Sequence, residues 1–271
     1  AARQPASLAR SGRFAYPCRP KPLRFDGIVS LYRAPRMTLA FLFPGQGSQS
    51  IGMGADLATA FACAREVFQE VDNALGQPLF KLMSEGPEGD LTLTENAQPA
   101  LMAVSVAVMR VLEKEFGVSI ERAAFVAGHS LGEYSALCAS GALTLSDTAR
   151  LLKLRGQAMQ RAVPVGAGAM AALIGHKTDV ALAEAAAAEG AKVGVCTVAN
   201  DNANGNVVIS GDKAGVEKAI EAAKEMGSRA IHLNVSAPFH SPLMSPAAEE
   251  MAAALAEAVI LAPRAPLVTN V

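Results

Sequence analysis

Short apolar runs and longer amphipathic segments alternate along the chain after residue 37. Residues 38–43 are mostly apolar and stop at Pro44-Gly45, and residues 123–127 form a second apolar run. Apolar runs of this length that end at turn residues predict buried strands. Helical patterns follow over residues 57–75, 99–116, 133–140 and 145–161. Strands that alternate with helices predict parallel βαβ units, and therefore an α/β fold whose sheet is covered on both faces.

The middle third of the chain has a different order of elements. Its patterns predict strand, helix, strand, strand, helix and strand over residues 169–174, 179–189, 193–199, 206–210, 213–226 and 229–235. This β-α-β-β-α-β order is the ferredoxin-like pattern. We therefore expect a small ferredoxin-like domain at about residues 165–236. It would be inserted into a large α/β-hydrolase-like domain with a parallel sheet, made of residues 37–164 and 237–271.

Residues 1–36 differ in composition from the rest of the chain. They hold seven arginines and one lysine against a single acid, Asp26, and five prolines recur among them. Arg-rich, acid-poor composition is typical of an organelle transit peptide; the alternative is non-native upstream sequence before a start at Met37. We favour the second interpretation and expect disorder in either case.

Charge and composition then narrow the class of protein. The formal net charge is −1, half of the residues are apolar and tryptophan is absent. Nothing here predicts nucleic-acid binding, and the apolar stretches are too short to cross a membrane, so we expect a soluble, cytoplasmic protein. The organellar alternative holds if residues 1–36 are a transit peptide. The four cysteines show no Cys-x-x-Cys spacing and no neighbouring histidines, so we expect no metal site.

The motif with most chemical content is Gly128-His129-Ser130-Leu131-Gly132. It fits the G-x-S-x-G nucleophile elbow in its required setting, after an apolar strand and before a helix. The following helix directs unpaired N–H groups toward developing oxyanion charge. A capped glycine turn is the plainer alternative, but the strand–helix context favours Ser130 as a nucleophile.

A serine nucleophile needs a base, and the chain contains four histidines. His129 adjoins Ser130, so its side chain should project away from the nucleophile. His176 reads as solvated surface, and His232 as an ordinary strand histidine. His240 lies in an irregular segment where the chain returns to the large domain, and loops at domain junctions collect catalytic groups. We therefore select His240 as the base.

The loop after the first predicted strand contains Gln46 between two glycines. Such a loop lies at the carboxyl edge of a parallel sheet, where ligands bind in α/β folds. Gln46 could present donors to a tetrahedral oxyanion together with the backbone N–H of Leu131. No Gly-Lys-Ser/Thr follows, which excludes a phosphate-binding loop.

Three motifs together resemble the malonyl-CoA:acyl carrier protein transacylases. They are FPGQGSQ at residues 43–49, GHSLGEY at 128–134 and APFHS at 237–241, and the similarity extends from Met37 to the end of the chain. The resemblance implies that Ser130 attacks a malonyl thioester with His240 as general base. It also implies that the malonyl group passes from the serine to the phosphopantetheine thiol of acyl carrier protein, in fatty acid synthesis.

The resemblance assigns further residues. Gln46 and the amide of Leu131 match the oxyanion hole, and Arg155 matches the arginine that binds the malonyl carboxylate. Phe239 resembles the residue found in malonyl-selective members, and Asn200 matches an asparagine near the acyl or pantetheine site. The implied partners are malonyl-CoA and acyl carrier protein, with no cofactor beyond coenzyme A as part of the substrate.

One departure from the family leaves alternatives open. Relatives continue some tens of residues beyond Val271, and that tail supplies a carbonyl that orients the histidine. We therefore expect a C-terminally truncated large domain in which no residue can be assigned this role. A serine esterase or lipase, which shares G-x-S-x-G, and an inactive truncated acyltransferase that only binds carrier protein are the two alternative functions.

Overall fold

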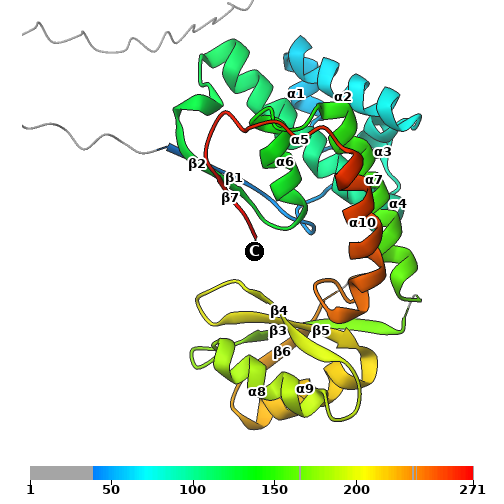
Figure 1. Ribbon diagram of the computed structural model, residues 1–271, viewed down its shortest axis with the longest axis vertical. Coiled ribbons are helices and arrows are strands. Elements are labelled where there is room, and N and C mark those ends of the chain that lie inside the picture. Colours follow the sequence, from blue (N-terminus) through cyan, green and yellow to red (C-terminus); the bar gives the residue numbers. More distant parts are fainter. Residues whose placement is uncertain (1–38, 165, 234, 236, 271) are drawn as a thin grey trace, which may run out of the picture. The chain divides into compact units, whose positions relative to one another are not determined.

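The computed structural model describes residues 39–164, 166–233, 235 and 237–270 of the chain. The two alternatives for residues 1–36 therefore lie outside the described residues. Within the described part the chain forms one parallel and one antiparallel sheet with helices packed on each, as Figure 1 shows. The sequence-based prediction of a mixed α/β chain with a parallel sheet is confirmed.

The parallel sheet has three described strands in the order β1–β2–β7. They are β1 (Leu39–Phe43), β2 (Ala123–Gly128) and β7 (Leu267–Val268). Leu42 pairs with Ala127, which in turn pairs with Val268, so these three residues lie on one face of the sheet. The opposite face carries Phe43 and Val126 and is buried.

A layer of helices covers this buried face, and the helices of the layer also pack against one another. Its members are α1 (Ala55–Ala60), α2 (Ala62–Leu75), α3 (Leu79–Glu85), α4 (Glu88–Thr92), α5 (Thr94–Phe116), the 3₁₀ turn η1 (Ile120–Arg122), α6 (Leu131–Ala139) and α7 (Leu145–Ala162). The largest apolar cluster of the described residues lies between α2, α5 and α7. Helix α5 is buried along much of its length, so it forms the platform against which α7 packs.

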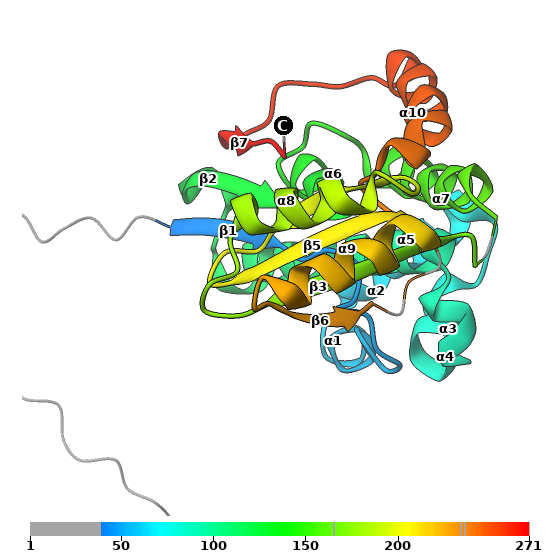
Figure 2. The same ribbon diagram turned by 90° about the horizontal axis from the view of Figure 1, so that it is seen from below.

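The antiparallel sheet has the strand order β4–β5–β3–β6. Its elements are β3 (Gly168–Ile174), α8 (Val180–Gly190), β4 (Cys196–Asp201), β5 (Asn206–Asp212), α9 (Lys213–Glu225) and β6 (Arg229–His232). Figure 2 shows α8 and α9 lying across one face of this sheet. Ala171 and Leu173 of β3 pack on that helical side, whereas Met170 and Ala172 point to the other side.

The chain then returns to the helical layer. The 3₁₀ turn η2 (Pro242–Met244) leads into α10 (Ser245–Glu257), which packs along α7 (Figure 1). Phe239, Ala237 and Met244 cover the second face of the antiparallel sheet together with the end of α7. This junction therefore joins the antiparallel sheet to α7 and α10 through a shared apolar cluster.

Three details differ from the sequence-based expectations. The helix predicted over residues 57–75 is divided at Phe61, whose backbone is extended (φ −128°, ψ 123°). Helix α5 begins five residues before Pro99, because its first turn is buried and packing outweighs the cost of an internal proline. The parallel sheet is not covered on both faces by the described residues, since Leu42 and Val268 are 75% and 51% exposed.

Candidate active site

Ser130 occupies a sharp turn between β2 and α6. Its backbone lies at φ 53°, ψ −111°, a conformation that costs a non-glycine residue about 1–3 kcal/mol. A side chain at Gly128 would collide with the backbone of Gly132, and one at Gly132 would collide with the carbonyl of Phe43. The two glycines of the motif are therefore required by close backbone approach, and the turn lifts Ser130 out of the sheet.

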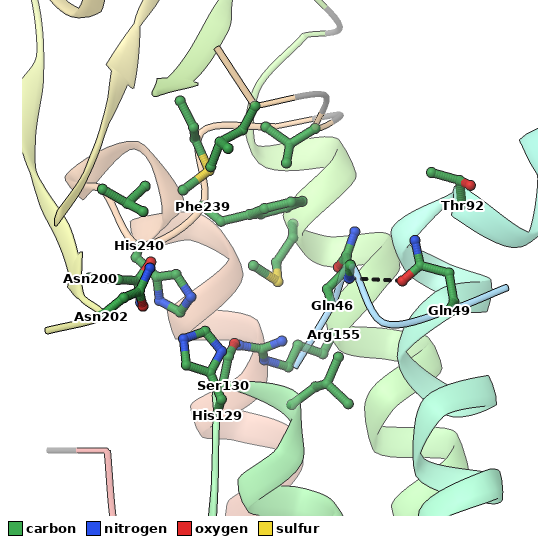
Figure 3. Close-up of a pocket in the computed structure, with 17 residues that line it drawn as sticks. Gln46, Gln49, Thr92, His129, Ser130, Arg155, Asn200, Asn202, Phe239 and His240 are labelled. Carbon is green, nitrogen blue, oxygen red and sulfur yellow. Dashed lines mark hydrogen bonds between the residues drawn. The ribbon is translucent and has the colours of Figure 1, made fainter. Parts of the chain in front are cut away.

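A pocket of about 240 Å³ opens at Ser130, between the loops that follow β1 and β2 and one face of the antiparallel sheet. The side chains that Figure 3 labels along its wall are Gln46, Gln49, Thr92, His129, Ser130, Arg155, Asn200, Asn202, Phe239 and His240. The loop after β1, the turn before α6, α7, the antiparallel sheet and the segment before η2 all contribute. The structure thus brings all seven residues singled out from the sequence to one cavity, Leu131 included.

Arg155 projects from α7 into this pocket. Its Nη2 donates a hydrogen bond of 3.0 Å to Ser130 Oγ, and its Nη1 donates one of 2.7 Å to Gln98 Oε1. The guanidinium also lies 5.8 Å from the ring centroid of Tyr134, within cation–π range. Burial is the largest cause that lowers the pKa of Arg155, yet a guanidinium stays charged at any physiological pH. The pocket therefore holds a fixed cation next to its serine.

His240 lines the same pocket from the segment before η2. Its backbone is left-handed, with φ 58°, so a second pocket residue is held in a strained conformation. Partial burial, then the charges of Arg155 and His129, lower the pKa of His240, which favours the neutral imidazole that a base requires. The described residues show no hydrogen bond between His240 and Ser130, whose hydroxyl is bonded to Arg155.

The oxyanion-hole candidates lie on the opposite wall. Leu131 begins α6, and its backbone N–H has no hydrogen-bond acceptor in the described part of the chain. The side chain of Gln46 lines the pocket, and its Oε1 accepts a 2.9 Å hydrogen bond from Thr94. Both groups can therefore donate to an oxygen that develops negative charge above Ser130.

Phe239 and Asn200 complete the residues named from the sequence. Phe239 is buried and packs against an apolar cluster with Met159 and Met170, so it forms part of an apolar wall. Asn200 lies in β4, beside Asn202, on the antiparallel-sheet side of the pocket. Both side chains therefore line the same pocket as Ser130.

The other three histidines have distinct surroundings. His129 was expected to project away from the nucleophile, but its side chain lies along the pocket wall with His240, which is a correction (Figure 3). Its ring packs against Gly45 in the loop after β1, where an added Cβ would lie 2.4 Å from His129 Nδ1. His176 is exposed, as expected for a solvated surface histidine, and His232 ends strand β6, where it lies 3.5 Å from Glu217.

The sequence analysis did not identify Asn270, whose hydrogen bonds hold the turn at Ser130 in place. Its Oδ1 accepts a 2.9 Å hydrogen bond from the backbone N–H of Ser130, and its Nδ2 donates one of 2.9 Å to the carbonyl of Gly128. Glu133 accepts from both the backbone and the side chain of Asn270. Because Asn270 is 140 residues away in sequence from Ser130, only the pairing of β2 with β7 reveals this contact.

Two negative observations bear on the class of site. Among the described residues, no three His, Cys, Asp or Glu side chains gather in a group that could hold a metal ion. Nor does any helix in this part of the chain combine the length and apolar character needed to span a bilayer.

Comparison with known proteins places this fold and site in a class. The sequence profile of the acyl transferase domain family matches residues 40–270, and the chain therefore belongs to that family of enzymes. The malonyl CoA-acyl carrier protein transacylase of Escherichia coli (strain K12) is 46% identical over 233 residues, which cover 86% of this chain and 74% of that protein.

Solved structures with similar folds carry the same kind of name. The acyl-carrier-protein-S-malonyltransferase of Bartonella henselae is 56% identical with a TM-score of 0.83, covering 86% of this chain and 74% of that one. A malonyl-transacylase in complex with its type II polyketide acyl-carrier protein is 44% identical with a TM-score of 0.82, again over 86% of this chain and 74% of that chain. The resemblance read from the three sequence motifs is confirmed.

Proposed function

We propose that the chain transfers a malonyl group from coenzyme A to the phosphopantetheine thiol of acyl carrier protein in fatty acid synthesis. It belongs to the acyl transferase family, and its relatives carry the names of malonyl CoA-acyl carrier protein transacylases. The family needs no cofactor beyond coenzyme A as part of the substrate. Its partners are malonyl-CoA and acyl carrier protein, and we propose a cytoplasmic location.

The observation that carries the proposal is the position of Arg155. A guanidinium whose Nη2 lies 3.0 Å from a serine hydroxyl can pair with the carboxylate of an acyl group attached to that serine. A simple esterase needs no cation at this place. Gln98 holds the other arm of the guanidinium, so Arg155 is oriented before the substrate arrives.

The transfer proceeds in two halves. In the first, Ser130 Oγ attacks the thioester carbonyl while His240 takes the hydroxyl proton, and the oxyanion is stabilised by Gln46 and the Leu131 N–H. The C–S bond then breaks, and the coenzyme A thiolate leaves as a thiol with the proton from His240. In the second half His240 takes the proton of the carrier thiol, whose sulfur attacks malonyl-Ser130, and the proton returns to Ser130 as the ester breaks.

Three finer assignments belong to the same proposal. Residues 37–164 and 237–271 form a large α/β-hydrolase-like domain, which the elbow at Ser130 supports. Residues 165–236 form a small ferredoxin-like domain, which the strand order β4–β5–β3–β6 supports. Asn200 from the small domain and Phe239 from the segment that re-enters the large domain would bind the acyl and pantetheine parts of the substrate.

Intact-protein mass spectrometry after brief mixing with malonyl-CoA tests the covalent route. We expect a malonyl adduct that is absent in Ser130→Ala and that disappears when acyl carrier protein is added. An adduct lost to water as fast as to the carrier thiol would instead identify a hydrolase. Carrier binding by a folded protein that forms no adduct would identify a binding protein without activity.

The role of Arg155 needs a second measurement. Replacing Arg155 with Ala should lower malonyl transfer at least about 100-fold, because a charge-assisted bidentate pair is lost, and acetyl transfer far less. The two rates are compared as kcat/KM for malonyl-CoA and acetyl-CoA with the same carrier. Equal losses for both substrates would contradict carboxylate recognition by Arg155.

A further inference from the structure

The first turn of α5 presents a carboxylate to two side chains of α7. Glu95 Oε2 lies 3.0 Å from Lys153 Nζ and accepts a 3.0 Å hydrogen bond from Gln157 Nε2. Lys153 and Gln157 are four residues apart on α7, so their side chains lie one turn apart on the same face of the helix. One oxygen of α5 therefore bridges two turns of α7, and Arg155 lies midway between them in the sequence.

The lysine of this bridge is held by further contacts. Besides its contact with Glu95, Lys153 Nζ donates hydrogen bonds of 2.9 Å to Gln77 Oε1 and 3.0 Å to Asn96 Oδ1. A lysine ammonium has three hydrogens, so these contacts use all of them. Gln77 Nε2 also donates a 3.0 Å hydrogen bond to Asn96 Oδ1. The bridge is thus part of a network, which holds its side chains more firmly than an isolated surface ion pair would.

The close contact at Gly156 cannot by itself fix α7 along its axis. An added Cβ at Gly156 would lie 2.4 Å from Glu95 Cα, so the two helices touch at this glycine. A glycine has no side chain to interlock with its neighbour, so this contact would allow α7 to slide along α5. Displacement by one residue would move the helix by about 1.5 Å. The hydrogen bonds of the bridge oppose such a slide, because Lys153 and Gln157 would leave Glu95 together.

From this arrangement we infer that Glu95 is a positioning residue that sets the place of Arg155 through α7. The inference rests on the proposed function, in which Arg155 binds the malonyl carboxylate. Gln98, one helical turn after Glu95, holds the end of the arginine side chain, while the bridge holds the backbone on both sides of it. A misplacement of about 1 Å can lower a rate about 100-fold. Selectivity for an acyl group with a carboxylate therefore depends on Glu95.

Competition between two thioesters measures this dependence. The chain is mixed briefly with equimolar malonyl-CoA and acetyl-CoA, and intact-protein mass spectrometry gives the ratio of malonyl-Ser130 to acetyl-Ser130. In Glu95→Ala both contacts of the bridge are lost, so we expect this ratio to fall about 10-fold. A lower folded fraction alone would reduce both adducts equally and leave the ratio unchanged. An unchanged ratio in Glu95→Ala would therefore overturn the inference.

Glu95→Gln is the conservative variant. Lys153 and Gln157 meet the same oxygen of Glu95, so the carbonyl oxygen of an amide can accept from both. We expect the adduct ratio to stay within about threefold of that of the unaltered chain, because the hydrogen bonds of the bridge are kept. A fall as large as in Glu95→Ala would contradict positioning by this shared acceptor.

Glu250→Ala is the matched control for the loss of a carboxylate bound to α7. Glu250 accepts hydrogen bonds of 2.7 and 2.9 Å from Arg161 Nη2, near the end of α7. An exposed pair at this place should contribute little, so we expect the adduct ratio to stay within about twofold. Equal falls in Glu250→Ala and Glu95→Ala would mean that any loosened contact of α7 changes selectivity, and would overturn the specific role of Glu95.

A double-mutant cycle with Arg155→Ala asks whether Glu95 acts through Arg155. With the arginine absent, Glu95→Ala should lower the adduct ratio no further, so the two effects are strongly non-additive. Effects that multiply would overturn the inference. Failure of the proposed function itself is distinguishable, because then the unaltered chain would form no malonyl-Ser130 adduct. A chain that forms both adducts in a ratio insensitive to Glu95→Ala would reject only the role of Glu95.

Discussion

Ser130 and His240 share a left-handed backbone that non-glycine residues rarely adopt, with φ of 53° and 58°. Such strain persists where surrounding contacts hold the residue in place. At Ser130 two of these contacts are hydrogen bonds from the side chain of Asn270, which accepts from the N–H of Ser130 and donates to the carbonyl of Gly128. The position of the nucleophile therefore depends on a side chain from the last described strand region.

Replacing Asn270 with Ala should loosen this turn. Two hydrogen bonds to its backbone are lost, so we expect a loss of about 1 kcal/mol in the free energy of unfolding and a fall in kcat larger than any change in KM. Urea unfolding and steady-state transfer assays measure these quantities. Asn270→Asp keeps an acceptor for Ser130 but faces Glu133 with a second carboxylate, and adding Glu133→Gln should restore part of the loss. No restoration would contradict this account of the contact.

The pH dependence of transfer reports on His240. Because burial and the charges of Arg155 and His129 lower its pKa, the neutral base persists to pH values below the ordinary histidine pKa of about 6.5. Acylation should therefore be lost as pH falls through a midpoint below that value. Removing a positive neighbour raises the pKa of His240, so Arg155→Met should move the midpoint of acetyl transfer to higher pH.

Single-turnover acylation measured between pH 4.5 and 8 would show this acid limb. His176→Gln is the matched control, since His176 is an exposed histidine outside the pocket lining. We expect its profile to match that of the unaltered chain. A midpoint above about 6.5 in the unaltered chain, or a shift in the His176 variant, would contradict His240 as the titrating base.

At the scale of elements, the crossing of α5 and α7 decides where Arg155 lies. An added Cβ at Gly156 would collide with the backbone of Glu95 in α5, so the glycine lets the two helices approach closely. Gly156→Ala must separate them and should destabilise the fold by about 1–3 kcal/mol while displacing Arg155. Urea unfolding and kcat/KM for malonyl-CoA measure the two effects.

Gly89→Ala is the matched control, because an added Cβ there meets nothing within 4 Å. Alanine also suits a helix better than glycine by up to about 1 kcal/mol. We therefore expect Gly89→Ala to be neutral or slightly stabilising with unchanged transfer. If Gly156→Ala were equally harmless, the close crossing would not be what positions Arg155.

The local pattern of apolar and polar residues predicted which helices and strands exist, but it predicted their first and last residues poorly. The apolar strand at 123–127 and the helix after Ser130 were found because turn residues bound them on both sides. The helical pattern predicts a start at Pro99, whereas the helix begins at Thr94, and Thr94 and Gln98 in its first turns are buried. Tertiary packing, which no local window contains, decides such boundaries.

Some residues of the candidate site could likewise be identified from the sequence, and others could not. Ser130, Gln46 and His240 stand in short motifs whose glycines and loops carry a chemical meaning, so sequence reasoning reached them. Thr94 and Asn270 act by hydrogen bonds to residues 48 and 140 positions away. These hydrogen bonds form when α5 approaches the loop after β1 and when β7 pairs with β2, and neither event has a local sequence signature.

At the scale of the whole described region, the strands of the antiparallel sheet contact helices on one face and the pocket on the other. Along β3 the alternation of side chains sends Ala171 toward α8 and α9, and Met170 toward Phe239 and the pocket. A shift of one residue in the register of β3 would exchange these faces and fill the pocket differently. The antiparallel sheet is therefore both a separate core and one wall of the site.

The open face of the parallel sheet gives the last prediction. Leu42, Phe125 and Val268 are 75%, 40% and 51% exposed on this face, and Leu42 and Val268 border a groove that runs to Asn270. Parallel sheets are normally covered on both sides, and a contiguous apolar face exposed to water promotes association. Replacing Leu42 and Val268 with Thr should therefore reduce dye binding and concentration-dependent light scattering.

The matched control replaces Val193 and Val108 with Thr, because these valines are 58% and 40% exposed but lie outside the sheet face. Single exposed apolar residues are ordinary on protein surfaces, so this pair should change neither signal. Both double variants should keep the free energy of unfolding within about 1 kcal/mol, since no buried contact is removed. Equal reductions in the two variants would mean that total surface hydrophobicity drives association; a reduction confined to Leu42 and Val268 would mean that the contiguity of the sheet face does.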